Sequence, residues 1–276
     1  MIYLYAYTNF KDGLDSLRRV KVIYEFLTQK GKECEILVND YRAQLTARDW
    51  GLPLATTIET IKDIDAVAGH EDTIIIDSPE PIEGKVLSYP SKFSRVIYLN
   101  SKCENVEFNG AETVDVYSLN SLIYPNLNID AKKDNGLYIY GDSDYEKIIL
   151  NNLSIFEGKN LDFYLGTYFF VKYEDKLASV FNSFVESEEY YSAIQEYPYI
   201  VTSSIQVAID IVKNGGKIIF LELKELNKCQ KKFLDEHNIS IVKEFSLDTI
   251  KINDYKSNNI SNLNIIFTNM WNNFTF

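Results

Sequence analysis

Short runs of apolar residues alternate along the chain with longer segments in which apolar residues recur at helical spacing. The first run, residues 2–7, precedes a segment at 14–30 that carries Leu17 and Leu27 on one helical stripe and stops at Gly31. A buried parallel strand appears as a short apolar run, and glycine is common just past the end of a helix. The pattern therefore predicts strand and helix units of the kind that build a parallel sheet.

The same alternation continues over most of the chain. Further strands are expected at residues 34–38, 73–77, 94–99, 137–140, 161–165, 199–202, 217–221 and 239–243. Helices are expected at residues 41–50, 57–64, 145–156, 173–185, 204–213, 224–237 and 259–272. Because the two element types alternate in both halves, the sequence predicts an α/β fold of two tandem Rossmann-like domains with a cleft between them.

A polar stretch separates the two halves. It contains Pro125 and ends in the turn Lys132-Lys133-Asp134-Asn135-Gly136, a composition typical of linkers. We expect an N-terminal domain at 1–120, a linker at 121–136, a C-terminal nucleotide-binding-type domain at 137–258 and a tail helix at 259–276. The tail helix either packs back across the domain interface or completes the core.

Composition narrows the class of protein. The 276 residues are 46% hydrophobic and 25% charged, with a net charge of −12, which is typical of a globular protein and repels nucleic-acid phosphates. No apolar run approaches the roughly 20 residues of a membrane span, and the first residues lack a basic leader. Three cysteines at spacings unlike a zinc or disulfide framework favour a cytoplasmic location.

Ligands of parallel sheets bind at the carboxyl ends of the strands. The candidate catalytic and binding residues are therefore those that follow the predicted strands. Asp12 and Asp15 follow the first strand and Asp77 ends the strand at 73–77. Each is a candidate base if burial raises its pKa. His70 and His237, the only histidines, are expected to be structural, and no metal or cofactor site is expected.

In the second half, Gly141, Ser143 and Asp144 follow a strand, and Ser203 and Ser204 open a helix. Small hydroxyl residues at a helix start leave backbone N–H groups for an anion, so the amides of the two serines are expected to face a ligand. The alternative is ordinary capping of the helix.

These positions resemble the GT-B glycosyltransferase superfamily, and within it the UDP-sugar hydrolases of pseudaminic-acid biosynthesis. The loop GxGHxxR of that family is similar to Gly13-Leu14-Asp15-Ser16-Leu17-Arg18-Arg19, and its GGxD is similar to Gly141-Asp142-Ser143-Asp144. The strand and the paired serines that open a helix in that family are similar to residues 199–205 of this chain. The resemblance implies a nucleotide diphosphate at that helix start, with Gly13, Ser16, Arg19, Gly141, Ser143, Asp144, Ser203, Ser204 and Gln206 as its binding residues.

The sequence also departs from that family at the positions that matter for chemistry. Ser16 replaces the catalytic histidine, Asp15 and Asp142 replace loop glycines, and Ala208 replaces the glutamate that contacts the ribose. The first hypothesis is therefore a bacterial, GT-B-like protein that binds a nucleotide-sugar, a hydrolase or transferase that serves the synthesis of surface or flagellin glycans. The alternative is a non-catalytic relative that serves as a binding or scaffold module for a protein partner.

Overall fold

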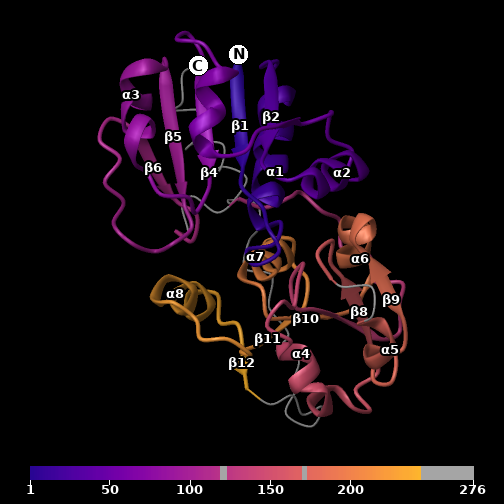
Figure 1. Cartoon of the computed structure of the whole chain (residues 1–276). Helices are drawn as coiled ribbons and strands as arrows, with labels where there is room; N and C mark the ends of the chain where they lie inside the picture. Colours follow the sequence, from indigo (N-terminus) through magenta and orange to yellow (C-terminus); the bar gives the residue numbers. More distant parts are fainter. Residues whose placement is uncertain (119–122, 170–172, 244–276) are drawn as a thin grey trace. The chain divides into compact units, whose positions relative to one another are not determined.

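The protein consists of two compact α/β units, Met1–Ile123 and Tyr124–Phe276. The computed structural model describes residues 1–118, 123–169 and 173–243 (Figure 1). The expected tail helix at 259–276 lies outside the described residues, and the cleft expected between the halves stays a prediction.

Unit 1 is built on a six-stranded parallel sheet in the order β3-β2-β1-β4-β5-β6. The strands are β1 (Ile2–Ala6), β2 (Cys34–Val38), β3 (Thr56–Thr57), β4 (Thr73–Asp77), β5 (Arg95–Asn100) and β6 (Glu112–Asp115). Helix α1 (Asp15–Gln29) packs on β1 and β2, and helix α2 (Tyr41–Asp49) packs on β2 and β3. The 3-10 helices η1 (Ile61–Ala66) and η2 (Gly84–Ser88), with α3 (Tyr89–Lys92), enclose a core rich in tyrosine and isoleucine.

Unit 2 repeats this architecture, with a parallel sheet in the order β12-β11-β10-β7-β8-β9. Its strands are β7 (Gly136–Ile139), β8 (Leu161–Leu165), β9 (Phe184–Glu186), β10 (Ile200–Thr202), β11 (Ile218–Leu221) and β12 (Ile241–Val242). An aromatic core joins the sheet to α4 (Ile148–Asn151), η3 (Leu153–Phe156) and α5 (Glu174–Leu177). The other helical elements are η4 (Ser187–Glu189), α6 (Tyr190–Glu196), α7 (Ile205–Lys213) and α8 (Lys228–Glu236).

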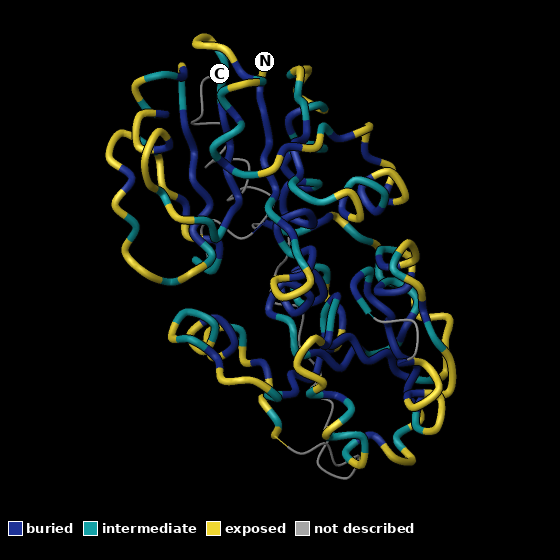
Figure 2. Tube along the Cα trace, viewed as in Figure 1, coloured by how far each residue is buried: buried dark blue, intermediate teal, exposed yellow. Residues whose placement is uncertain are grey.

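The central strands are buried on both faces (Figure 2). This burial explains why they appear in the sequence as continuous apolar runs rather than as alternating patterns. In both units the first strand of the unit lies next to the fourth, so the direction of chain progression across the sheet reverses at β1/β4 and at β7/β10. Ligands of doubly wound sheets bind at the carboxyl ends of the strands at such a switch point.

Several predicted elements differ from the structure. The helix expected at 173–185 is wrong, because only the short α5 forms and the chain then enters β9; α6 and the edge strand β6 were not expected. The helix expected at 57–64 is β3 followed by η1, and that expected at 145–156 is α4 followed by η3. The end of α1 before Gly31 is confirmed, with Gly31 at a φ of +73°.

The chain before β7 is attached to unit 2 by backbone hydrogen bonds, although its composition is that of a linker. Asp130 N–H donates to Gln195 O at 2.9 Å, and Lys132 N–H donates to Glu196 O at 2.8 Å. The side chain of Asn214 also accepts from Leu127 N–H at 2.8 Å. Residues 124–133, called here the 124–133 segment, therefore lie along the ends of α6 and α7.

Candidate functional site

The loop after β1 is a self-contained turn. The Asn9 side chain accepts the N–H groups of Lys11 and Asp12 at 2.6 and 2.8 Å and donates to Asp12 Oδ2 at 2.7 Å. Gly13 closes the turn at a φ of +73°, with its N–H on Asn9 O at 2.8 Å. Asp12, a candidate base, is exposed and its carboxylate takes part in this local turn.

The first turn of α1 uses its polar side chains in local contacts as well. The Ser16 hydroxyl donates to Tyr7 O, and Asp15 forms an ion pair with Arg18 at 2.9 Å. The guanidinium of Arg18 also lies 5.4 Å from the ring centre of Trp50. Ser16 therefore ties the start of α1 to the end of β1, a structural role that the sequence did not indicate.

Asp77, the third candidate base, forms a bidentate ion pair with Arg19. Arg19 Nε and Nη2 donate to the two carboxylate oxygens at 2.7 and 2.9 Å, and the side chains are only 5% and 1% exposed. Burial alone lowers the pKa of Arg19, but the Asp77 charge and its hydrogen bonds outweigh burial and raise it. The sequence placed Asp77 with the bases and Arg19 with the ligand contacts, whereas the structure joins them to each other.

Glu80 organises the loop after β4, although the sequence gave it no role. It accepts from the Tyr5 hydroxyl at 2.7 Å, from Ser78 Oγ at 2.8 Å and from Ile61 N–H at 3.1 Å. Burial, followed by the Glu80 charge, raises the pKa of Tyr5, so the phenol remains a donor. In the sequence, only its position three residues after the end of an apolar strand marked this carboxylate.

In unit 2, the loop after β7 contains a glycine with open space beside its backbone and a serine hydroxyl without a hydrogen-bond partner among the described residues. Gly141 has a φ of +148°, and an added Cβ there would meet no atom within 4 Å. The Ser143 hydroxyl has no hydrogen-bond partner among the described residues. On the other side of the loop, the Asp142 backbone is so close to Gly166 that a Cβ on Gly166 would lie 2.2 Å from Asp142 Cα.

Asp144, expected to contact a ligand, is instead engaged by its own unit. Its carboxylate accepts the N–H groups of Ile148 and Ile149 at 2.7 and 2.9 Å, and the Tyr173 hydroxyl donates to it as well. The side chain is buried. These contacts assign Asp144 to the capping of α4.

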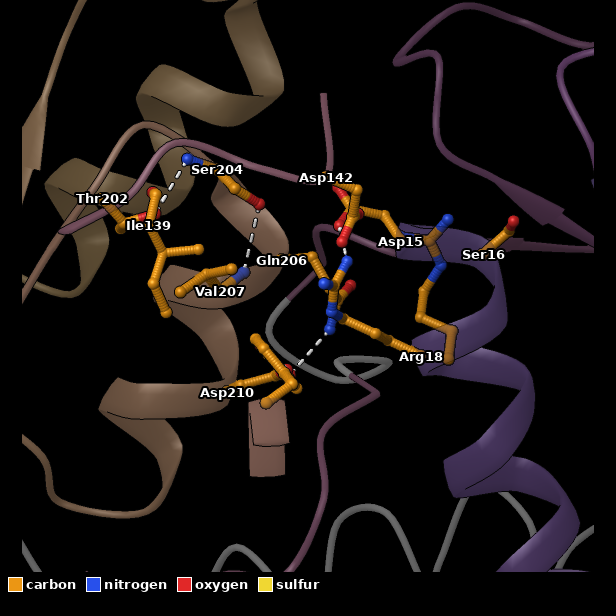
Figure 3. A network of polar contacts seen from close by, with 12 residues as sticks. Asp15, Ser16, Arg18, Ile139, Asp142, Thr202, Ser204, Gln206, Val207 and Asp210 are labelled. Atoms are coloured by element: carbon orange, nitrogen blue, oxygen red, sulfur yellow. Dashed lines mark hydrogen bonds and ion pairs between the residues drawn. The ribbon is translucent and has the colours of Figure 1, made fainter. Parts of the chain in front are cut away.

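The start of α7 differs from the expectation that the amides of Ser203 and Ser204 face a ligand. Ser203 N–H donates to Ile139 O at 3.2 Å, and Ser204 N–H donates to Thr202 Oγ1 at 3.0 Å. Ser204 Oγ caps the helix by accepting Val207 N–H at 3.3 Å (Figure 3). The capping alternative is therefore confirmed, and the two serine amides are not available to an anion.

The first turn of α7 contains two further groups that bear on ligand binding, the backbone N–H of Ile205 and the side chain of Gln206. Ile205 N–H has no acceptor among the described residues. Gln206, named from the sequence as a ligand contact, donates from Nε2 to Asp210 at 2.9 Å (Figure 3). Asp210 also accepts the Tyr190 hydroxyl at 2.8 Å. Ala208 is fully buried, so the position where the resembling family has a ribose-binding glutamate belongs to the core.

Both histidines contact backbone carbonyl groups. His70 Nδ1 contacts Lys92 O at 2.7 Å and His237 Nδ1 contacts Phe233 O at 2.9 Å, which agrees with structural roles. Among the described residues there is no group of three or more His, Cys, Asp or Glu side chains that would hold a metal. No helix in the described part of the chain has the length and apolar character required to cross a bilayer.

Two Rossmann-like units in tandem, each with its switch point between its first and fourth strands, define a GT-B-type fold. A solved structure similar to the chain is UDP-GlcNAc 2-epimerase from Neisseria meningitidis bound to UDP-GlcNAc, at a TM-score of 0.50 and 8% identity, covering 99% of this chain and 92% of that one. MurG from Acinetobacter baumannii follows at a TM-score of 0.41 and 12% identity, covering 98% and 90%. No family model and no curated protein matches the sequence. At these identities the similarity to the epimerase shows a shared fold.

Proposed function

We propose that the protein binds a nucleotide-sugar, with UDP as the expected nucleotide, at the carboxyl ends of β7 and β10. The observation that carries the proposal is the buried Ser143 hydroxyl, which lies in a loop at the switch point of unit 2 and has no hydrogen-bond partner in the part of the chain that the structure describes. A buried polar group without a hydrogen-bond partner lowers the stability of the folded protein. In native proteins, such a group marks an unfilled binding site or a bound water. A phosphate oxygen would supply the acceptor.

Two further features of unit 2 favour a phosphate. Gly141 has no side chain and open space beside it, so a ligand would approach the backbone closely. Ile205 N–H lies in the first turn of the nine-residue α7, where the helix dipole attracts negative charge. The proposed contacts are therefore Gly141, Ser143 and Ile205, in place of the amides of Ser203 and Ser204.

The sequence resemblance supports the finer proposal of a bacterial, cytoplasmic relative of the UDP-sugar hydrolases of pseudaminic-acid biosynthesis, serving surface or flagellin glycans. The solved epimerase with the same fold was determined bound to UDP-GlcNAc, and UDP-GlcNAc is therefore the first ligand to test. The Asp142 side chain is buried and accepts the Tyr164 hydroxyl at 3.4 Å, so its carboxylate is engaged within the protein.

A second candidate, binding without turnover, is favoured by the ion pair of Arg19 and Asp77. A base must accept a proton from water, whereas this carboxylate is held by two guanidinium hydrogen bonds. Asp12 and Asp15 are likewise engaged in local contacts. In this form the protein would be a non-catalytic binding or scaffold module for a protein partner.

The test compares the wild-type protein with Ser143→Ala and, as a matched control, Ser179→Ala, which removes an exposed hydroxyl elsewhere in unit 2. Titration calorimetry with UDP and UDP-GlcNAc gives the affinity. A hydrogen bond to a charged group contributes about 1.5–3 kcal/mol, so Ser143→Ala should weaken binding roughly tenfold or more and leave the melting temperature unchanged or raised. Ser179→Ala should change neither.

The absence of binding at millimolar nucleotide would refute the proposed ligand class, and equal affinities for the two serine variants would refute the proposed site. Release of UDP from UDP-GlcNAc separates the two candidates. Binding with measurable, enzyme-dependent hydrolysis would overturn the candidate without turnover, whereas binding with no release above the uncatalysed rate supports it.

A further inference from the structure

The loop proposed to receive the phosphates is followed by a helix that does not cap itself. Lys147, the N-cap residue of α4, has a left-handed φ of +57° and makes no side-chain capping hydrogen bond. The helix has only four residues, too few to be stable alone. Asp144 supplies the missing acceptors, since its carboxylate oxygens accept the N–H groups of Ile148 and Ile149.

A buried phenol donates to the same carboxylate, at the oxygen that also accepts Ile149 N–H. Tyr173, at the start of α5, donates its hydroxyl to Asp144, and its ring is 6% exposed within the aromatic core of unit 2. Burial, followed by the hydrogen bond and charge of Asp144, raises the pKa of Tyr173. The phenol therefore stays protonated at physiological pH and remains a donor.

The residues just before Asp144 are fixed as well. Tyr168 N–H donates to Asp142 O at 3.0 Å, and Gly166 packs directly against the Asp142 backbone. The loop between Gly141 and Asp144 is thus held at both ends by contacts within unit 2. A loop that is already ordered loses less entropy when it binds a ligand.

From this arrangement we infer that Tyr173 and Asp144 are positioning residues, which hold the Gly141–Asp144 loop in its binding conformation before a nucleotide arrives. The inference deepens the proposed function and rests on it for the identity of the ligand. Neither residue is required to touch the nucleotide. Loss of the phenol would let Asp144 leave α4 and lower the fraction of protein in the competent conformation, and affinity falls in proportion to that fraction.

The chain provides a matched control at the other end of the same sheet. Tyr197 donates to Asp162 Oδ2 at 2.5 Å, and these two side chains are also buried. Asp162 pairs with Leu137 near the start of β7, away from the carboxyl ends of the strands. Burial, followed by the hydrogen bond that Tyr197 donates to Asp162, raises the pKa of Tyr197 too. Tyr197→Phe therefore removes a chemically equivalent bond without touching the loop.

The experiment compares Tyr173→Phe with Tyr197→Phe in the full chain. Thermal unfolding measures the general cost of each change, hydrogen exchange measures the opening of the Ile148 and Ile149 amides, and calorimetry with UDP-GlcNAc measures affinity. Both variants should have a lower melting temperature than the wild-type protein. Only Tyr173→Phe should accelerate exchange at the two amides, by about tenfold for the loss of one charge-assisted bond, and weaken nucleotide binding by several-fold.

Equal exchange rates and equal affinities in the two variants would overturn the inference. If Tyr173→Phe fails to fold, Asp144→Asn, which keeps an acceptor oxygen for one amide, takes its place with the same expected results. Exchange is measured without nucleotide, so a wild-type protein that binds no UDP-GlcNAc refutes the proposed function while the exchange comparison still decides whether the pair holds the loop.

Discussion

The ion pair between Arg19 and Asp77 provides the strongest single test of the structure. Asp77→Asn keeps the size of the side chain and removes its charge, leaving a guanidinium that is 5% exposed without its counter-charge. Removing one partner of a buried pair costs about 3–5 kcal/mol. Both hydrogen bonds are short, at 2.7 and 2.9 Å, so we expect a loss of about 4 kcal/mol in the free energy of unfolding.

Urea unfolding, followed by the fluorescence of Trp50 in a Trp271→Phe background, reports on unit 1. With a slope of about 2 kcal/mol per molar urea, the midpoint should fall by roughly 2 M. Asp65→Asn is the matched control, because Asp65 pairs with the partly exposed Lys85 and Lys92. Ion pairs of that kind contribute under about 1 kcal/mol.

The reasoning is refuted if the two variants shift the midpoint equally, or if Asp77→Asn leaves it within about 0.3 M of the wild-type value. The double variant Arg19→Met, Asp77→Leu provides a further check, because replacing both charges by apolar groups should recover most of the loss.

Two further outcomes are expected. Gly166→Ala places a Cβ 2.2 Å from Asp142 Cα, so it should cost about 1–3 kcal/mol of stability and weaken nucleotide binding; an unchanged melting temperature in calorimetry would contradict the packing. Burial raises the pKa of Cys34 from about 9 to about 11, so alkylation of Cys34 in the native protein at pH 8 should be up to about 100-fold slower than in urea, as measured by mass spectrometry. The same shift makes the protein lose stability as pH rises from about 9 through 11, because the unfolded thiol ionises first.

The fold was largely predictable because strands that are buried on both faces appear in the sequence as continuous apolar runs. The runs at β1, β4, β7 and β8 are apolar throughout or nearly so, and few other structures produce such runs. The edge strand β6 gave no signal, since only Val114 in it is buried. The segment at 173–185 carries apolar residues at helical spacing, yet tertiary packing turns its end into β9.

The site was predictable only as a location. Strand order places the loops after β1 and β4, and those after β7 and β10, at the two switch points. The sequence does not reveal which side chains there satisfy one another. Arg19 and Asp77 are 58 residues apart, and Asp144 looks like a ligand contact until the amides of α4 are seen to bind it.

The 124–133 segment affects how the second unit should be isolated. The linker-like composition of the preceding residues suggests that a shortened gene for the second unit could start at Leu137. Such a gene would remove the backbone groups that form hydrogen bonds with Gln195, Glu196 and Asn214. Carbonyl and amide groups that lose such partners invite pairing with other chains. Expression of the second unit by itself should therefore begin at Tyr124, so that the ten residues of the 124–133 segment keep these groups paired and protect the unit from aggregation.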